Sequence, residues 1–301
     1  MGPTHPECPA RLSAIEDQLI ASGLMATMQR YAAPLATREQ LARVHTPEYI
    51  ASLDAIAPSR GMVYLDPDTA MNPHSLNAAY RAAGAVILAT DLVIGNKAQN
   101  AFCNIRPPGH HAMHNRAMGF CLFNNIAVGV AHALAAHGLE RVAVVDFDVH
   151  HGNGTEDIFG DERYAARVMM ASIFQHPFYP YGGIEGRSKH PERMVNIPLA
   201  AGSNGEAFRA VVNQHWLPAL ETFKPQMLFI SAGFDAHRDD DLASLNLVEA
   251  DYAWVTARVK EIADKYAQGR IVSALEGGYE LHALGRSVVA HLKILGGLGK
   301  C

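Results

Sequence analysis

Carboxylates and a histidine gather in residues 146–150, where an apolar run ends in Asp146, Asp148 and His150. Side chains alternate along a strand, so these three are expected on one face. Together with Asp235, which follows another apolar run, Asp148 and His150 make a ligand set for a divalent metal. Two carboxylates and one imidazole leave a fourth position for water, as in catalytic zinc sites. The same set suits iron(II) or cobalt.

Two adjacent histidines, His110 and His111, follow the rigid turn formed by residues 107–109, Pro-Pro-Gly. One imidazole can act as a general base towards a water molecule, and the other can stabilise the charge that develops. Each ring needs a partner that fixes which nitrogen carries the proton. Asp146 and Asn153 are the candidates for that orienting role.

A tyrosine and two further aromatic residues lie in glycine- and proline-rich segments. Tyr279 follows Gly277 and Gly278 and can donate its hydroxyl to a carbonyl oxygen that becomes an oxyanion. Phe120 and Tyr179 are expected to form the walls of a narrow apolar channel. The sequence therefore predicts a metal, a base and an oxyanion donor below an apolar channel.

Other reactive residues have simpler interpretations. Cys103 and Cys121 are expected to be small buried apolar residues, because no base is free to activate them. Most of the remaining histidines, including His132 and His137, lack ligand spacing and are interpreted as surface or packing residues. The acidic run 239–241 is interpreted as a solvated loop.

Alternating strands and helices must position these residues. Strands are predicted over five short apolar runs, at 100–105, 141–147, 168–173, 227–232 and 270–275. Helices are predicted over 73–92, 124–137, 205–222, 248–267 and 280–296, and Pro218 is expected to kink or end the third. This order predicts an α/β fold with a mainly parallel central sheet between two helical layers. Ligands bind beyond the carboxyl ends of such strands, where the reactive residues lie.

Composition limits the partners. The 301 residues are 49% hydrophobic and contain no linker-like stretch, so residues 1–301 are predicted to form a single domain. A formal charge of −5 gives no reason to bind nucleic acid or a membrane surface, although it suits a cationic substrate weakly. Four scattered cysteines and no apparent signal segment favour a cytoplasmic protein. The sequence leaves oligomerisation open.

Seven segments resemble the histone deacetylase family, specifically its class II and bacterial deacetylase-like amidohydrolase branches. The matching strings are HPECPARL (5–12), RPPGHHA (106–112), GFCLFNN (119–125), VDFDVHHGNGTEDIF (145–159), YP (179–180), SAGFDAH (231–237) and LEGGY (275–279). They occur in the family's order over nearly the whole chain. The resemblance begins almost at residue 1, so a strand that relatives usually carry before it is expected to be absent.

The resemblance implies an arginase/deacetylase-like fold and a role for each matching residue. It implies zinc on Asp148, His150 and Asp235, His111 as the general base with His110 assisting, and Tyr279 as the carbonyl-polarising residue. The implied acyl-lysine channel contains Gly119, Phe120, Tyr179, Leu242, Gly277 and Gly278. Family members also bind potassium, which here would use Asp146, Asp148, His150 and Ser172, with a second site nearer Phe159.

Two positions depart from parts of the family. Asn153 stands where class I relatives have Asp, so the imidazole that it orients is expected to be less basic. Leu242 aligns with a position where the polyamine-specific branch carries Glu, which favours acetyl-lysine.

Several functions stay open. The expected reaction is hydrolysis of acetyl-lysine side chains or related N-acetylated amines to release acetate. The alternatives are an acetylpolyamine or other small-molecule amidohydrolase, a non-catalytic acetyl-lysine reader, and a two-manganese ureohydrolase. The retained tyrosine and histidines disfavour the reader, and the tyrosine and apolar channel residues disfavour the ureohydrolase.

Overall fold

A six-stranded parallel sheet forms the centre of the computed structural model, which describes residues 1–2, 4–184 and 191–299. The strand order is β3-β8-β7-β4-β5-β6. The strands are β3 (Asn100–Cys103), β4 (Val142–Asp146), β5 (Val168–Gln175), β6 (Met194–Leu199), β7 (Met227–Ala232) and β8 (Ile271–Leu275). A separate antiparallel hairpin pairs β1 (Val63–Tyr64) with β2 (Ala70–Met71).

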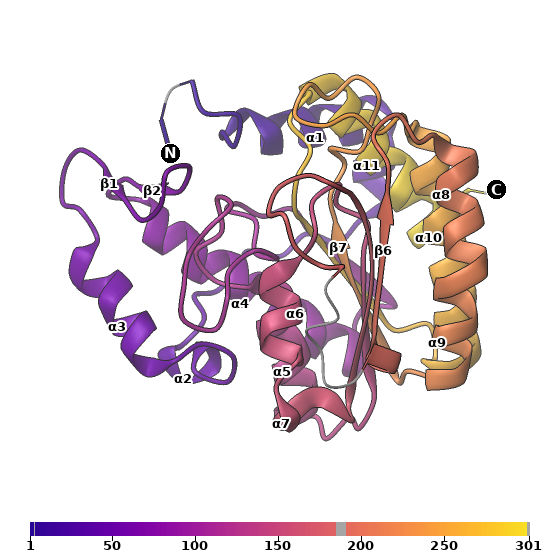
Figure 1. Cartoon of the computed structure of the whole chain (residues 1–301), viewed down its shortest axis with the longest axis horizontal. Helices are drawn as coiled ribbons and strands as arrows, with labels where there is room; N and C mark the ends of the chain where they lie inside the picture. The colour runs from indigo at the N-terminus through magenta and orange to yellow at the C-terminus, as the bar shows by residue number, and fades with distance from the viewer. Residues whose placement is uncertain (3, 185–190, 300–301) are drawn as a thin grey trace.

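Helices cover both faces of this sheet (Figure 1). Alternate residues of β4 separate the two cores: Val142 and Val144 pack with one helical layer, and Ala143 and Val145 pack with the other. The first layer contains α4 (Ser75–Ile94), α5 (Asn125–Ala136) and α6 (Asn153–Phe159). The second contains α1 (Ala10–Ala21), α8 (Gly205–Val211), α9 (Leu217–Phe223), α10 (Glu249–Tyr266) and α11 (Leu281–Leu295). The predicted three-layer fold is confirmed.

Shorter elements complete the described chain: η1 (Leu24–Thr27), α2 (Arg38–Leu41), α3 (Pro47–Ile56), α7 (Glu162–Ala165), η2 (Pro191–Arg193) and η3 (Val212–Trp216). The predicted helix 205–222 is interrupted, because η3 forms a π-helical turn between α8 and α9. Pro218 lies in the first turn of α9, right after this π turn, so the interruption falls where the proline was expected to kink or end the helix.

One helix, α4, is also long and apolar enough to cross a membrane. Its Ala79, Ala83 and Val86 are fully buried in the core beside the sheet. Half of the most apolar stretch of this helix is buried inside the protein, as expected for a core helix.

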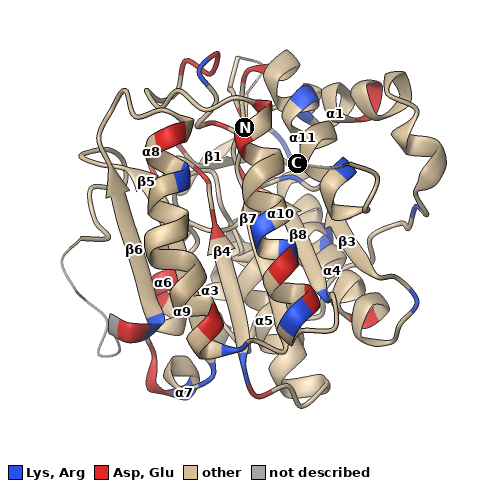
Figure 2. Ribbon diagram, turned by 90° about the vertical axis from the view of Figure 1, so that its right-hand side faces the viewer, with Lys and Arg blue, Asp and Glu red and all other residues tan. Residues whose placement is uncertain are grey.

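Reactive residues lie beyond the carboxyl ends of β4, β7 and β8, which are adjacent or nearly adjacent in the sheet. Figure 2 shows the strands almost free of charged residues along their length, with acidic residues at the end of β4. Neighbouring parallel strands bring their carboxyl ends to one edge, so residues far apart in sequence meet there.

Candidate active site

Three ligand-type residues converge beyond β4 and β7. The Nδ1 atom of His150 lies 3.1 Å from Asp148 Oδ1 and 3.2 Å from Asp235 Oδ2, and the three candidate ligand atoms all lie within 4.8 Å of one another. Both carboxylates are buried, and Asp235 Oδ2 accepts no aligned hydrogen bond, although His150 Nδ1 lies 3.2 Å from it. Two buried carboxylates this close together are costly unless a cation neutralises them. These residues therefore fit a metal ion.

Backbone groups hold the two carboxylates in place. The N–H of Gly277 donates to Asp148 Oδ2 at 2.8 Å, and the N–H of Val149 donates to Asp235 Oδ1 at 3.0 Å. A Cβ atom at Gly277 would lie 2.6 Å from Asp148 Oδ2 and closer still to Asp235 Oδ2. Gly277 thus lies against the candidate metal ligands, where any side chain would displace them.

The predicted alternation on one strand face is wrong for this segment. Strand β4 ends at Asp146, so Asp148 and His150 lie in the following loop. The loop still brings them together, because Asp146 Oδ1 accepts the backbone N–H of Asp148 and Asp148 Oδ1 accepts that of His150. Asp146 Oδ2 lies 3.0 Å from His110 Nδ1, the orienting contact predicted for it.

The two histidines have different electrostatic surroundings. His111 Nδ1 lies 2.7 Å from Asn153 Oδ1, and an amide oxygen only accepts, so Nδ1 carries the proton and Nε2 keeps its lone pair. Burial, together with His110 and His150, lowers the pKa of His111 well below its ordinary value. Burial also disfavours charge on His110, but Asp148 and Asp146 outweigh it and raise the pKa of His110.

A buried glutamate that we did not predict fixes the turn before these histidines. Glu276 Oε2 accepts the backbone N–H groups of Gly109 at 2.6 Å and His110 at 3.1 Å. Its other oxygen accepts the hydroxyl of Ser231 at 3.1 Å. Burial raises the pKa of Glu276 to about 7. The sequence indicates a role for the nearby Tyr279, but its pattern does not indicate where the Glu276 side chain points.

Tyr279 is held by two residues that we had not assigned to the site. Asp240 Oδ2 accepts the backbone N–H groups of Tyr279 at 2.6 Å and Glu280 at 3.0 Å. Interpreting Asp240 as part of a solvated loop was wrong, since only 4% of it is exposed. The Arg11 guanidinium lies 4.8 Å from the ring of Tyr279, and its Nε donates to the backbone oxygen of Gly278. Burial raises the pKa of Tyr279 well above its usual value, which keeps its hydroxyl a donor.

Aromatic rings stand around this centre. The ring of Tyr179 lies 5.3 Å from that of His111, and the ring of Phe120 lies 5.9 Å from that of Tyr279. Phe120 has a positive φ of 68°, and its N–H donates to the Thr69 hydroxyl at 2.9 Å. Contact with a hairpin residue therefore helps to hold an unusual backbone conformation.

The remaining predicted channel residues have distinct environments. Gly119 has a φ of 56° and lies so close to the His111 ring that a Cβ atom would overlap it. Gly278 also has a positive φ, of 114°. Leu242 is 36% exposed, and its N–H donates to Asp240, the residue that anchors Tyr279.

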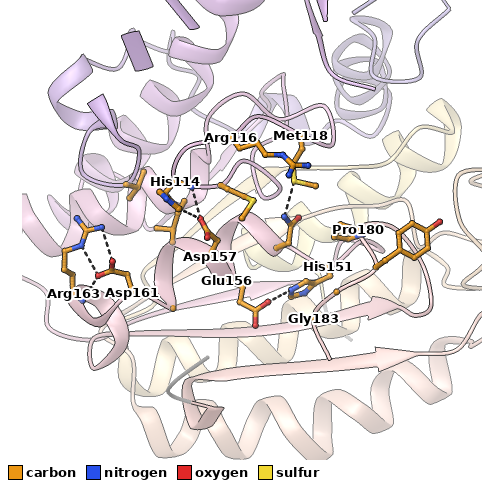
Figure 3. Close-up of a pocket in the computed structure, with 17 residues that line it drawn as sticks. His114, Arg116, Met118, His151, Glu156, Asp157, Asp161, Arg163, Pro180 and Gly183 are labelled. Atoms are coloured by element: carbon orange, nitrogen blue, oxygen red, sulfur yellow. Dashed lines mark hydrogen bonds and ion pairs between the residues drawn. The ribbon is translucent and has the colours of Figure 1, made fainter. Parts of the chain in front are cut away.

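A cavity of about 570 Å³ lies beside this centre, along one side of α6 (Figure 3). Asn153 and Met118 line it, so it reaches the partner of His111. Its acidic side chains are engaged: Asp157 pairs with His114, Glu156 with His151, and Asp161 with Arg163.

A second group of metal-ligand types lies far from this edge. Asp91 Oδ1 is 2.7 Å from Nε2 of both His132 and His137, so these two packing histidines share one carboxylate, a contact that the sequence did not predict. The Arg43 Nη1 atom lies 2.8 Å from His132 Nδ1, and arginine can only donate. His132 therefore carries its proton on Nε2, facing Asp91, and this group is satisfied without a metal.

Comparisons with known proteins agree with this geometry. Residues 5–295 match the family model described as the histone deacetylase domain. The chain is 40% identical to a histone deacetylase-like amidohydrolase from Pseudomonas aeruginosa over 91% of this chain and 72% of that protein. It is 38% identical to a probable deacetylase from Archaeoglobus fulgidus over 93% of this chain and 77% of that protein. The crystal structure of the HDA15 HD domain superposes with a TM-score of 0.90 at 35% identity, covering 97% of this chain and 85% of that one. The chain therefore belongs to the histone deacetylase family and is an amidohydrolase of that family.

Proposed function

We propose that this protein is a zinc-dependent deacetylase that hydrolyses the amide of acetyl-lysine side chains or related N-acetylated amines and releases acetate. One observation carries the proposal: Nδ1 of His150 lies 3.1 and 3.2 Å from the buried carboxylates of Asp148 and Asp235, and these three ligand-type residues fit one metal ion. Zinc bound by these three residues would polarise the amide carbonyl and lower the pKa of a water molecule in its open position.

Protein groups supply the proton transfers. His111 would accept a proton at Nε2, because its Nδ1 is engaged with Asn153. His110, whose pKa Asp148 and Asp146 raise against the effect of burial, would hold positive charge beside the reacting atoms. Tyr279 would donate its hydroxyl to the carbonyl oxygen as that oxygen becomes negative, and Asp240 holds its backbone in place.

The channel residues favour a substrate whose acylated side chain is extended and uncharged. Phe120 and Tyr179 offer aromatic faces to the methylene groups of a lysine side chain. Leu242, whose backbone N–H donates to Asp240, has an apolar, partly exposed side chain and no carboxylate. This environment supports acetyl-lysine as the substrate.

Small cationic acetylamines are the second candidate, because Asp66 and Asp68 lie on the hairpin beside the channel. The Asp68 carboxyl accepts a hydrogen bond from the backbone of Gly119. Burial raises the pKa of Tyr179, and the charges of Asp68 and Asp66 add to that effect. No described cation pairs with either carboxylate. Acidic groups at this position would attract an acetylated polyamine.

We further propose potassium beside the zinc ligands. Ser172 pairs in register with Asp146, and its buried Oγ atom has no hydrogen-bond partner. A cation held by Asp146, Asp148, His150 and Ser172 would satisfy that oxygen, and a second site would lie nearer Phe159. A cytoplasmic location, with neither nucleic acid nor membrane as partner, remains our proposal from the composition.

Substrate panels test the proposal. Zinc-loaded protein would be offered fluorogenic acetyl-lysine peptides and a series of acetylpolyamines, and acetate release would be measured. Turnover of the peptides at a higher kcat/KM supports acetyl-lysine, and the reverse order supports the second candidate. Stoichiometric zinc with turnover of neither substrate class would contradict the proposed function.

A further inference from the structure

A tight turn presents Met118 to the residue that orients His111. The backbone groups of Met118 and Cys121 exchange two hydrogen bonds, at 3.2 and 3.0 Å. Gly119 and Phe120 between them both have positive φ values, of 56° and 68°. These features define a two-residue type I′ turn, whose geometry leaves little freedom to the flanking residues. Only 7% of Met118 is exposed.

The side chain of Met118 contacts the amide of Asn153. The Nδ2 atom of Asn153 donates to Met118 Sδ at 3.4 Å, the dashed line that reaches Met118 in Figure 3. The Oδ1 atom of the same amide lies 2.7 Å from His111 Nδ1. Among the residues that the structure describes, Met118 offers the only side-chain acceptor to Nδ2. The acidic groups nearby do not compete, because Glu156 and Asp157 are engaged with histidines.

The two ends of an amide have opposite effects on the neighbouring imidazole. With Oδ1 towards His111, Nδ1 must carry the proton and Nε2 keeps a lone pair. With the amide reversed, its NH₂ group would face Nδ1 and favour the tautomer protonated at Nε2, which cannot act as a base there. A thioether sulfur accepts hydrogen bonds and never donates, so it favours the first orientation.

We propose that Met118 is a positioning residue that fixes the orientation of the Asn153 amide and, through it, the tautomer of His111. The proposal deepens the proposed function and depends on His111 acting as the base. An acceptor at position 118 is needed for this orientation only because residue 153 is an asparagine. A carboxylate at position 153 would have two equivalent oxygens and no orientation to specify, whereas an asparagine has one correct orientation.

A double-mutant cycle tests this coupling. Met118→Leu keeps an apolar side chain of similar size but removes the acceptor. In zinc-loaded protein it should lower kcat about 2- to 12-fold, the effect of losing one ordinary hydrogen bond, with KM and zinc content unchanged. In an Asn153→Asp background the same change should have no further effect on kcat. Equal losses in both backgrounds, or no loss in either, would overturn the proposal.

A spectroscopic measurement separates this proposal from the proposed function. In protein labelled with ¹⁵N-histidine, the ring shifts of His111, assigned by their loss in His111→Ala, report which nitrogen carries the proton. Native protein should show the Nδ1–H tautomer, and Met118→Leu should show a mixture with the Nε2–H form. An unchanged tautomer in Met118→Leu would overturn the proposal even if no substrate were turned over.

A second variant covers the case in which Met118→Leu does not fold. Met118→Ala removes the acceptor without adding a branched side chain, so its ¹⁵N spectrum should also show a mixture of the two tautomers of His111. An unmixed Nδ1–H tautomer in folded Met118→Ala would overturn the proposal. Native protein that binds zinc and shows the expected tautomer, yet hydrolyses no acetylated amine, would contradict the proposed function alone.

Discussion

We predict that zinc binding at the proposed site requires the absence of a side chain at Gly277. In Gly277→Ala, the new Cβ atom would lie 2.6 Å from Asp148 Oδ2 and closer to Asp235 Oδ2, whereas ordinary contacts begin near 3.4 Å. One or both carboxylates must therefore move by roughly 1 Å. Zinc ligands tolerate displacements of only about 0.2 Å, so we expect zinc affinity to fall by more than about 100-fold.

Thermal unfolding with and without zinc measures this loss. At free zinc about 1,000-fold above its Kd, binding stabilises native protein by about 4 kcal/mol. For a chain of 301 residues this corresponds to a rise in Tm of about 6 °C. Gly277→Ala should lose most of that rise while unfolding cooperatively without zinc. Gly182→Ala is the control, because no atom lies within 4 Å of its added Cβ. A zinc-dependent rise in Gly277→Ala equal to that of native protein would refute the steric reasoning.

Three further predictions concern the surroundings of the site. Asp240→Asn should lower kcat about 10-fold with zinc content retained, because a neutral amide accepts the backbone N–H of Tyr279 in a weaker hydrogen bond than a carboxylate does. An unchanged kcat would contradict this role of Asp240. Burial lowers the pKa of His45 to about 4 in the folded protein, whereas the unfolded chain binds a proton near pH 6.5. The free energy of unfolding should therefore be about 3 kcal/mol higher above pH 6.5 than below pH 4, and this difference is lost as pH falls between the two values. Urea unfolding should show that loss in native protein and less of it in His45→Gln; parallel curves would count against it. Burial and hydrogen bonding with Asp66 raise the pKa of Asp68 to about 6. Asp68 gains its negative charge as pH rises through about 6, so KM for cationic acetylamines should fall over that range while KM for neutral substrates stays constant. Asp68→Asn should remove this difference between the two substrate types.

Periodicity and strand-end chemistry were enough to predict most of the fold. The five predicted strands correspond to β3, β4, β5, β7 and β8, because each is a short apolar run bounded by polar loops. Strand β6 was missed because Asn196 and Pro198 interrupt its apolar pattern at an edge of the sheet. Pro218 predicted an interruption of helix 205–222, but not its form, because the residues of the π-helical turn η3 favour an ordinary helix.

The reactive residues were easier to find than their supports. Asp148, His150 and Asp235 follow apolar strands, so their chemistry is visible in the sequence. Asp240 was not predicted, because its role is to accept two backbone N–H groups from a segment 39 or more residues away. Met118 was not predicted for a similar reason, since nothing in the sequence around a methionine indicates that its sulfur contacts the amide of Asn153. Supports of this kind depend on tertiary proximity.

The contact between Asp91 and two histidines was also not predicted. His132 and His137 are five residues apart, which is not a spacing that places two side chains on one face of a helix. They meet at Asp91 because His137 lies just beyond the end of α5, at its C-cap. Helical spacing rules do not apply past a helix end.

The central claim is best tested by measuring acetate release from an acetyl-lysine peptide by native protein and Tyr279→Phe, both with their zinc content determined. We predict zinc-dependent turnover by native protein, its loss on chelation and its recovery when zinc is returned. Tyr279→Phe should keep its zinc and lose about 10²- to 10³-fold in kcat, the effect of removing one oxyanion donor. Native turnover that is independent of zinc, or a fully active Tyr279→Phe, would contradict the account.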